Sequence, residues 1–239
     1  MTMHRDPPSV HRVAVYFAPH PDSLHGQAGS TWLGRCALHD APLPQPVVQG
    51  ISPQQLVDLT AEPRRYGWHG TLKAPFRLGQ NVQLADVRAA LRRLCEGRPA
   101  FELPMQVAVL GDFLALRPTH ASPALDALAA DCVQTLQALA DPLSAEELAR
   151  RRRAGLTPEQ DALLQAWGYP YVLSQFRFHL SLTGSLKDLS DTARAQLLEA
   201  AQQHFQGLAS CRIDRLSLFI EPESGAPFRL FEQVEFSDE

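Results

Sequence analysis

Two short motifs in the sequence place a hydroxyl residue two positions after a histidine. One is His69-Gly70-Thr71-Leu72 and the other is His179-Leu180-Ser181-Leu182. Side chains alternate between the two faces of a β-strand, so the histidine and the hydroxyl of each motif would point to the same side. Histidine has an ordinary pKa of about 6.5, which lets it both remove and donate protons near neutral pH. Two such motifs facing each other would supply a general base, a general acid and two hydroxyl groups.

These groups suit the cleavage of a phosphodiester bond. The attacking oxygen must lose a proton and the leaving oxygen must gain one, so one imidazole has to be neutral and the other protonated. Such a coupled pair predicts a bell-shaped dependence of rate on pH, centred near neutrality. Hydroxyls and cations would hold the non-bridging oxygens as negative charge builds up. No metal ion and no other cofactor is then needed, and no carboxylate or third histidine stands beside either motif.

The same alternation adds further polar groups to the two motif faces. Lys73 would share the face of Thr71, and Arg177 and Thr183 would share the face of Ser181. Lys73 and Arg177 are therefore candidate phosphate ligands, with a solvated strand end as the alternative for each. Further candidate substrate contacts near the motifs are Tyr66, Tyr171 and Arg64. A tyrosine could stack on a base or sugar, although half-buried packing is the commoner role.

Strands and helices that could position these motifs follow one another along the chain. Runs of β-branched and aromatic residues predict strands over 12–19, 67–78, 101–109, 113–117, 176–184, 211–220 and 228–236. Apolar spacing and capping residues predict helices over 23–34, capped by Asp22, and over 53–60, 84–96, 123–139, from 144, 157–167 and 189–205. The mixture predicts an α+β protein.

The order of these elements repeats. Each histidine strand is followed by a helix, a strand, a turn and another strand, which predicts two related lobes that meet at a cleft. We therefore expect residues 1–239 to form one bilobal domain. Its first repeat would span about 12–118, a helical insertion about 122–167, and its second repeat about 171–236. One motif alone is weak evidence for a site, whereas two in a repeated order are strong evidence.

The paired motifs resemble those of the 2H phosphoesterase superfamily, which contains LigT-like RNA ligases and cyclic phosphodiesterases. The surrounding segments look more like a branch of this superfamily that is associated with bacterial phosphonate metabolism. They are RRYGWHGTLKAPF at 64–76 and WGYPY at 167–171. The resemblance implies a duplicated, bilobal LigT-like α+β fold with two antiparallel-sheet lobes and flanking helices around a central cleft. It further implies His69 and His179 as acid and base, Thr71 and Ser181 as phosphate ligands, and a ribose cyclic phosphate or nucleotide as substrate.

Composition limits the partners. The 239 residues carry a net charge of -4, which disfavours wrapping of DNA and a large RNA partner but not a small phosphorylated substrate. The first ten residues have no apolar run of a signal peptide, and no segment is long and apolar enough to cross a membrane. The four cysteines are far apart, as in reduced proteins. We therefore expect a cytoplasmic protein, whose oligomeric state the sequence leaves open.

Several functions remain open at this point. The first is a phosphoric diester hydrolase of the cyclic phosphodiesterase type. The alternatives are a non-catalytic protein that binds a nucleotide or RNA end in the same cleft, and an RNA end-joining ligase. The run Arg150–Arg153 is typical of a solvated helix end, and the alternative is a basic rim that attracts an anionic substrate. The sequence contains no glycine-rich phosphate loop, GxSxG or HExxH motif.

Overall fold

A computed structural model describes residues 10–153 and 155–237 of the chain. The first nine residues, where no signal peptide was expected, lie outside this part. The described residues form a mixed α+β fold with eight α-helices and ten strands. The strands are β1 (Arg12–Phe17), β2 (Arg35–Cys36), β3 (Ala41–Pro42), β4 (Gly70–Phe76), β5 (Phe101–Leu110), β6 (Phe113–Pro118), β7 (Leu180–Ser181), β8 (Ser210–Ile213), β9 (Arg215–Glu221) and β10 (Arg229–Glu235). The helices are α1 (Leu24–Leu33), α2 (Pro53–Leu59), α3 (Ala61–Tyr66), α4 (Leu84–Cys95), α5 (Pro123–Gln137), α6 (Ala145–Arg152), α7 (Pro158–Trp167) and α8 (Asp191–His204).

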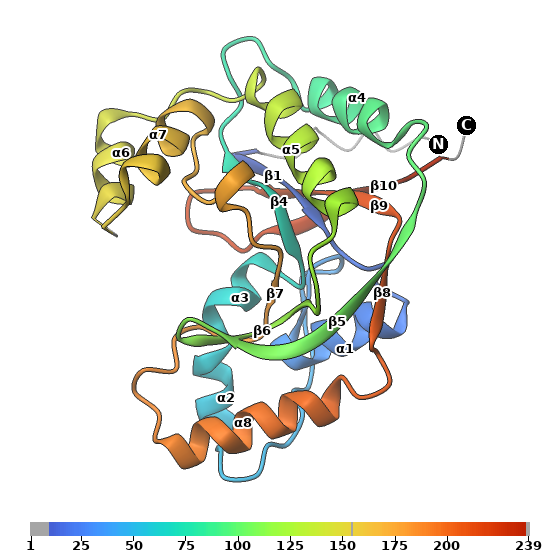
Figure 1. Ribbon diagram of the computed structural model, residues 1–239, viewed down its shortest axis with the longest axis vertical. Helices are drawn as coiled ribbons and strands as arrows, with labels where there is room; N and C mark the ends of the chain where they lie inside the picture. The colour runs from blue at the N-terminus through green and yellow to red at the C-terminus, as the bar shows by residue number, and fades with distance from the viewer. Residues whose placement is uncertain (1–9, 154, 238–239) are drawn as a thin grey trace, which may run out of the picture.

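Eight of the strands form one large antiparallel sheet. Their order is β10-β9-β1-β4-β7-β6-β5-β8, and β2 and β3 form a small separate hairpin. β8 and β9 are separated only by Asp214, yet β8 lies at one edge of the sheet and β9 is second from the other edge. The sheet therefore curls until its two ends meet at this residue (Figure 1). The strand predicted over 211–220 is thus two strands that serve opposite ends of one continuous sheet.

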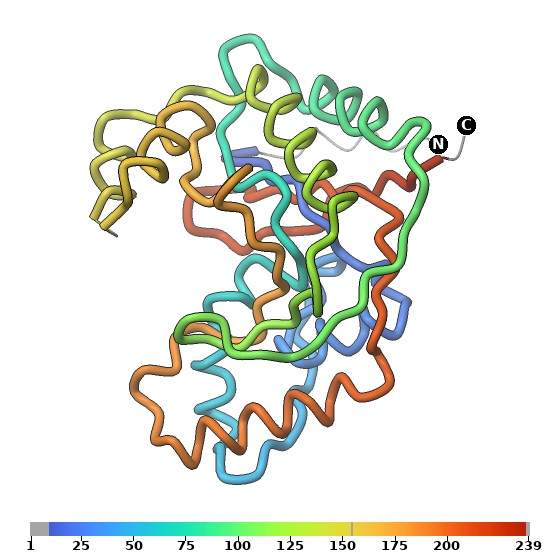
Figure 2. Tube along the Cα trace, in the orientation of Figure 1, coloured from blue at the N-terminus to red at the C-terminus, as the bar shows by residue number. Residues whose placement is uncertain are grey.

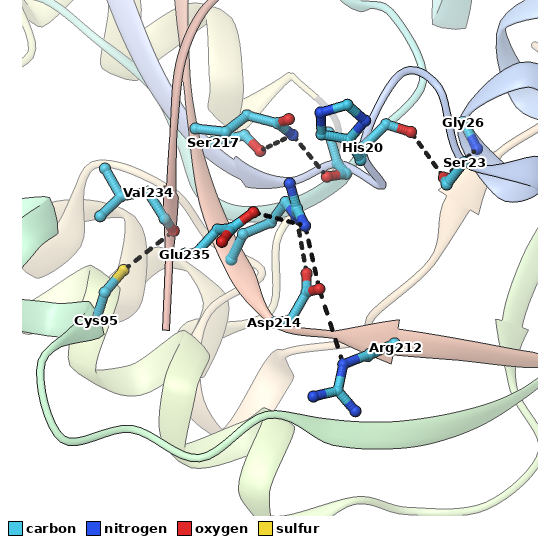
Figure 3. Close-up of polar contacts among 12 residues, drawn as sticks. His20, Ser23, Gly26, Cys95, Arg212, Asp214, Ser217, Val234 and Glu235 are labelled. Carbon is cyan, nitrogen blue, oxygen red and sulfur yellow. Dashed lines mark hydrogen bonds and ion pairs between the residues drawn. The ribbon is translucent and has the colours of Figure 1, made fainter. Parts of the chain in front are cut away.

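Polar contacts fix the junction at Asp214. Its carboxylate accepts from Nε and Nη2 of Arg215 at 2.7 and 3.1 Å, and the Arg212 side chain lies near it (Figure 3). Its backbone carbonyl accepts from Phe236 N at 2.7 Å. A change of direction between two paired strands leaves backbone groups that need partners, and the bond from Phe236 N supplies one for the Asp214 carbonyl.

The helices cover the sheet on both sides of its curl. α5 packs against β4, α4 against β9 and β10, and α8 against β5 (Figure 2). On β1, Val13, Val15 and Phe17 enter the main core, whereas Tyr16 belongs to a smaller cluster with Phe219 and Phe228 on the other face. The alternation in β1 therefore supports a core on one face and carries an aromatic residue to the opposite face.

The predicted strand over 176–184 is much shorter in the structure. Only Leu180 and Ser181 form β7. The hydroxyl of Thr183 accepts from Leu114 N at 3.0 Å, and this side-chain bond takes the place of a ladder bond between β6 and the chain after β7. A local hydroxyl–backbone bond of this kind competes with sheet pairing, which the pattern of side chains did not reveal.

Helix ends follow their capping residues closely. The helices expected at 144 and 157 begin as α6 and α7, each with a capping box. α1 is capped by Ser23 rather than by the expected Asp22. α3 was not predicted, because it has only six residues with a proline inside, and it ends at Gly67 with a φ of 80°. None of the helices in the described ranges is long and apolar enough to span a membrane.

Candidate active site

The two histidine motifs lie on neighbouring strands. β4 and β7 pair antiparallel through Gly70 and Leu180. Continuing this register by one residue places His69 opposite Ser181 and Thr71 opposite His179, all on the same face. These four side chains line one cleft, which has a volume of about 660 Å³. The structure therefore brings the two motifs together, as the sequence predicted. The antiparallel pairing relates them by an approximate twofold axis at the Gly70–Leu180 pair.

Gly70 makes the close approach of these strands possible. A Cβ atom at this position would lie 2.4 Å from Cε2 of the Phe178 ring, far inside contact distance. Phe178 is buried and directly precedes His179. The glycine of the first motif therefore gives room to the aromatic residue that sets the position of the second histidine.

His69 is held by backbone and ring contacts. Its Nδ1 lies 2.8 Å from the Gly67 carbonyl oxygen and its Nε2 lies 3.2 Å from Oγ1 of Thr71. The ring stacks on Tyr16 with centroids 3.8 Å apart. Burial lowers the pKa of His69 to about 4, the bond to Gly67 opposes this shift, and the neighbouring His179 adds to it. His69 is therefore neutral in the free protein near neutral pH.

His179 is held in the same way but is less enclosed. Its Nδ1 lies 2.7 Å from the Arg177 carbonyl oxygen, and its ring lies beside Phe113. Burial lowers its pKa as well, against the bond to the Arg177 carbonyl, and the charge of Arg117 lowers it further.

The two Nδ1 contacts decide the tautomer of both rings. A carbonyl oxygen can only accept, so Nδ1 carries the hydrogen in each ring. When an imidazole is neutral, its Nε2 is then free to accept a proton, and when it is protonated, Nε2 can donate one. The two rings are thereby prepared for the same kind of proton transfer through the same atom.

Lys73 does not line this cleft, contrary to the strand alternation that predicted it. Its side chain is 3% exposed, and Nζ donates to Oε1 of Gln137 at 2.6 Å and to the Trp167 carbonyl at 3.1 Å. The reason is a shift of register in β4 opposite β1, between Thr71 and Lys73, which breaks the alternation of side chains. Burial lowers the pKa of Lys73 to about 8. This lysine ties β4 to α5 and to the end of α7.

Arg177 and Tyr171 line a side chamber rather than the main cleft. This chamber has a volume of about 340 Å³ and shares Thr71, Phe113 and His179 with the cleft. Tyr171 is 44% exposed. Both predicted residues therefore lie near the second motif, with Phe176 and Val172 adding an apolar wall.

Two other residues that were predicted to contact the substrate are hydrogen-bonded to the protein backbone instead. The hydroxyl of Thr183 lies at the cleft, but it accepts from Leu114 N and donates to the Gly184 carbonyl at 2.8 Å, and the residue is 2% exposed. Arg64 does not line the cleft and donates to the Val57 carbonyl at 2.6 Å, near the end of α2. Tyr66 does line the cleft, as expected, and stacks on Phe228.

The cleft contains residues that the motifs did not predict. Tyr16 and Arg12 reach it from β1, and Tyr169 reaches it from the chain after α7. Arg12 and Tyr16 are four residues apart and therefore share a face of β1, but nothing in the sequence linked that face to the histidines. From the arginine run at 150–153, Arg150 and Arg151 line the cleft. Their position is the one that the alternative interpretation of the run, a basic rim that attracts an anionic substrate, requires.

Charge is unevenly distributed along the cleft. Arg12, Arg150 and Arg151 line it together with Tyr66 and Tyr169. A different part of the lining contains acidic and hydroxyl groups, where Ser185 donates to Asp112 at 2.6 Å and Glu62 lies beside Gly184. Among the residues described, no three histidine, cysteine, aspartate or glutamate side chains are grouped so that they could hold a metal ion.

Two curated proteins are similar to this chain. One, from Janthinobacterium sp. (strain Marseille), is 41% identical over 233 residues, which cover 96% of this chain and 51% of that protein. The other, from Laribacter hongkongensis (strain HLHK9), is 39% identical over 219 residues, which cover 92% and 50% of the two chains. Both are named "Ribose 1,5-bisphosphate phosphokinase PhnN". The chain thus spans about half of the length of these relatives.

A solved structure and a protein family also match. The structure, described as "Crystal structure of phosphoesterase", aligns over 97% of this chain and 99% of its own with a TM-score of 0.40 and 12% identity. Residues 71–229 match the family described as "Protein of unknown function (DUF1045)", and this segment runs from the hydroxyl of the first motif through the whole second motif to β10. The chain belongs to the DUF1045 family.

Proposed function

We propose that this protein is a metal-independent phosphoesterase that hydrolyses a cyclic phosphate or another small phosphodiester, with His69 and His179 as its acid–base pair. The observation that carries the proposal is the antiparallel pairing at Gly70 and Leu180, which brings both motifs to one cleft. The matching Nδ1 contacts of the two rings support it, because they leave both Nε2 atoms able to exchange protons.

We further propose a role for each histidine from the difference in their surroundings. Burial lowers the pKa of His69 to about 4, which favours its neutral form and so its use as the general base. Its Nε2 takes a proton from a water molecule as the water oxygen bonds to phosphorus. His179 is more open, and in its protonated form it gives the Nε2 proton to the leaving oxygen as the old P–O bond breaks. A cyclic phosphodiester and water thereby become one phosphate monoester.

Thr71 and Ser181 hold the phosphate during this step. The Thr71 hydroxyl donates to the neutral Nε2 of His69 in the free protein, at 3.2 Å, and turns to a non-bridging oxygen when substrate binds. Ser181 lines the cleft in the equivalent place of the second motif. Hydrogen bonds that strengthen as charge builds up on these oxygens lower the barrier.

The relatives indicate a class of substrate. Their name refers to a ribose bisphosphate, which favours a sugar phosphate as the molecule that this chain binds. We do not carry the kinase activity over to this chain, because its sequence has no GxxxxGK[S/T] phosphate loop. A phosphoesterase and a kinase that act on related sugar phosphates are consistent with a shared role in phosphonate metabolism.

The twofold relation of the motifs also supports the predicted duplication. We propose that residues 12–118 and 171–236 are two repeats that share one curled sheet, with the helices between 122 and 167 inserted between them. Under this proposal each repeat supplies one histidine and one hydroxyl to the cleft.

The side chamber favours a second candidate function. Its apolar wall at Phe113, Val172 and Phe176 could receive a nucleobase next to His179, as a protein that binds a nucleotide or RNA end without turnover would require. An RNA end-joining enzyme would use the same residues in the reverse direction. Both alternatives predict that nucleotides bind more tightly than sugar phosphates.

Phosphorus NMR with EDTA present tests the proposal. The panel holds ribose cyclic phosphates, 2′,3′-cyclic nucleotides and linear dinucleotides, each mixed with the wild-type protein, His69→Ala and His179→Ala. We expect a cyclic phosphate signal to be replaced by a monoester signal, and each substitution to slow this by at least about 100-fold. His120→Ala is the matched control, because His120 is an exposed histidine outside the cleft.

The outcomes separate the candidate functions. Turnover that survives in either cleft variant would exclude the two-histidine mechanism. Turnover that requires an added metal would exclude the metal-independent step. Signal broadening by nucleotides without any product would instead favour the binding protein.

A further inference from the structure

Three arginines from two distant parts of the chain meet in the cleft. Arg12 is the first residue of β1, whereas Arg150 and Arg151 belong to the last turn of α6. All three line the same cleft as the histidine pair. The proposed hydrolysis of a diester uses the histidines and hydroxyls alone, so the function proposed above does not account for these cations.

The arginines are close enough to repel one another. Arg151 is anchored by a bond from Nη1 to the Gly168 carbonyl at 2.8 Å, and its guanidinium lies 5.9 Å from the centre of the Tyr169 ring. Burial lowers the pKa of Arg151 most, Tyr169 and the carboxylate of Glu147 raise it, and the charges of Arg150 and Arg12 lower it. Three guanidinium groups that line one cleft without an anion repel one another.

Two carboxylates lie near the arginines, and both also bind other cations. Glu147 is near Arg151, but its two oxygens accept from Nη1 and Nη2 of Arg77 at 2.9 and 2.7 Å. Nε of Arg12 donates to the fully buried carboxylate of Glu221, but the same carboxylate also accepts from Nη2 of Arg65 at 2.7 Å. No ion pair links Arg150 or Arg151 to an acidic residue in the described part of the chain. This end of the cleft therefore keeps a net positive charge.

A solvated helix end does not explain which arginines face the cleft. Arg152 pairs with Asp161 at 2.6 Å and Arg153 is exposed, and neither lines the cleft. These two residues account for a favourable contact with the helix dipole. Arg150 and Arg151 instead line the cleft opposite β1, where an anion would meet all three guanidinium groups.

We infer that the arginine end of the cleft binds a second phosphate of the substrate, so that the substrate is a small cyclic phosphate that also carries a phosphate monoester. This inference rests on the proposed function, since it places the cyclic diester at the histidines. A monoester is a better ligand for several guanidinium groups than a diester, because it carries more charge and more free oxygens.

The distance along β1 limits the size of the substrate. Arg12 and Tyr16 are four residues apart, which corresponds to about 13 Å of strand, and Tyr16 stacks on His69. The Arg12 guanidinium lies 5.6 Å from the centre of the Phe228 ring, which is 6.5 Å from the centre of the Tyr16 ring, so the Arg12 side chain covers part of this span. The remainder suits one sugar unit between two phosphates, and it is too short for an oligonucleotide.

Pairs of substrates that differ only in the second phosphate test the inference. One pair is ribose 1,2-cyclic phosphate and its 5-phosphate, and another is a nucleoside 2′,3′-cyclic phosphate and its 5′-phosphate. We expect the wild-type protein to prefer the 5-phosphorylated sugar by about 10- to 100-fold in kcat/KM, the factor that charge-assisted hydrogen bonds supply. Arg150→Ala should remove most of this preference by raising KM for that substrate alone.

Matched variants keep the test specific. Arg153→Ala removes the same charge from the same helix end outside the cleft, and it should leave the preference unchanged. Arg151→Ala should act like Arg150→Ala, but it also loses the bond to Gly168. Because Arg150 is exposed and has no such bond, Arg150→Ala is the variant on which the conclusion depends.

Calorimetry with ribose 5-phosphate separates this inference from the proposed function. If no cyclic phosphate is hydrolysed but ribose 5-phosphate binds at least 10-fold more weakly to Arg150→Ala than to wild type and Arg153→Ala, the proposed function fails and the anion site stands. If cyclic phosphates are hydrolysed with equal kcat/KM whether or not they carry the second phosphate, the inference is overturned and the hydrolase stands. Equal binding of ribose 5-phosphate to wild type and Arg150→Ala also overturns it.

Discussion

At the scale of single residues, the two histidines share one type of contact and differ in their surroundings. Each donates through Nδ1 to the carbonyl two residues before it. His69 is packed against Tyr16, whereas His179 has a more open ring beside Phe113. The shared contact gives both rings the same tautomer, and the different packing gives them different proton affinities.

These surroundings predict an acidic pH optimum for kcat/KM. His69 must be neutral, so the rate falls as pH drops towards its pKa of about 4. His179 must be protonated, so the rate also falls as pH rises through its pKa, which is lowered below 6.5. We therefore expect a bell-shaped profile on the acidic side of neutrality rather than centred on it. The profile of kcat should lie at higher pH, because bound phosphate raises the pKa of both histidines.

Arg117 provides a check on this assignment. Its charge lowers the pKa of His179, so Arg117→Gln should move only the alkaline limb of the kcat/KM profile, towards higher pH. Arg93→Ala, an exposed arginine outside the cleft, is the control for a general change of charge. Movement of the acidic limb instead would show that His179, and not His69, has the lower pKa of the pair.

The sequence was informative about these residues because both motifs combine two unusual side chains at one spacing. It was misleading about Lys73, since alternation holds only while a strand keeps its register. It contained no signal for Arg12 or Tyr16, because their place in the cleft depends on β1 lying next to β4 in the sheet. Pairing between distant strands is a property of the fold and not of either strand alone.

At the scale of elements, the cleft depends on how closely β4 and β7 approach each other. β7 has only two residues and pairs with β4 through a single residue pair. The packing of Phe178 over Gly70 and a bond from Nε1 of Trp32 to the Leu182 carbonyl at 2.9 Å hold the chain on both sides of β7. Side-chain packing therefore replaces much of the ladder that a longer strand would have.

Gly70→Ala tests the importance of this packing. The added methyl group would overlap the Phe178 ring and displace the backbone before His179. We expect kcat to fall by about 10- to 100-fold, because small displacements of a catalytic group are costly. The free energy of unfolding, measured with urea, should fall by about 1–3 kcal/mol, the usual cost of an overpacked core.

Two further variants show whether the overlap is the cause. Gly79→Ala adds the same methyl group where the nearest atom is 3.5 Å away, so it should leave kcat unchanged. Phe178→Leu in the Gly70→Ala background makes room for the methyl group and should restore part of the activity. A full loss that this second substitution does not relieve would mean that Gly70 acts in some other way.

Most helices and strands could be predicted because their caps and periodicity are local. The short β7 could not, because the Thr183 hydroxyl competes for Leu114 N across the sheet. α3 was also missed, although it carries Tyr66 and leads into the first motif. Both misses lie beside the candidate site, where local patterns give way to contacts between distant segments.

At the scale of the whole molecule, one extended segment joins the two ends of the sheet. β8 pairs with β5, while β9 pairs with β1 and β10, and only Asp214 lies between them. The sequence predicted this segment as one strand, although its apolar alternation changes phase at Asp214-Arg215, between Ile213 and Leu216. The curl of the sheet is visible only when both sets of partners are known (Figure 1).

Asp214→Ala is expected to destabilise the whole sheet. The side chain of Arg215 is 9% exposed and makes two bonds to the Asp214 carboxylate, so the substitution leaves a buried guanidinium with little compensation. We expect a loss of about 2–4 kcal/mol in the free energy of unfolding, as measured by urea denaturation. Because β8 and β9 belong to opposite ends of one sheet, fluorescence and circular dichroism should report a single transition at a lower urea concentration.

Glu235→Ala is the matched control for this junction. Glu235 also pairs with Arg215, at 3.3 Å, but its side chain is 72% exposed, so its removal should cost less than about 1 kcal/mol. Two separate transitions in Asp214→Ala would show that the two ends of the sheet unfold independently. An unchanged stability would show that the buried guanidinium of Arg215 finds another partner, and the closure of the sheet would then rest on backbone bonds such as that from Phe236 N to the Asp214 carbonyl.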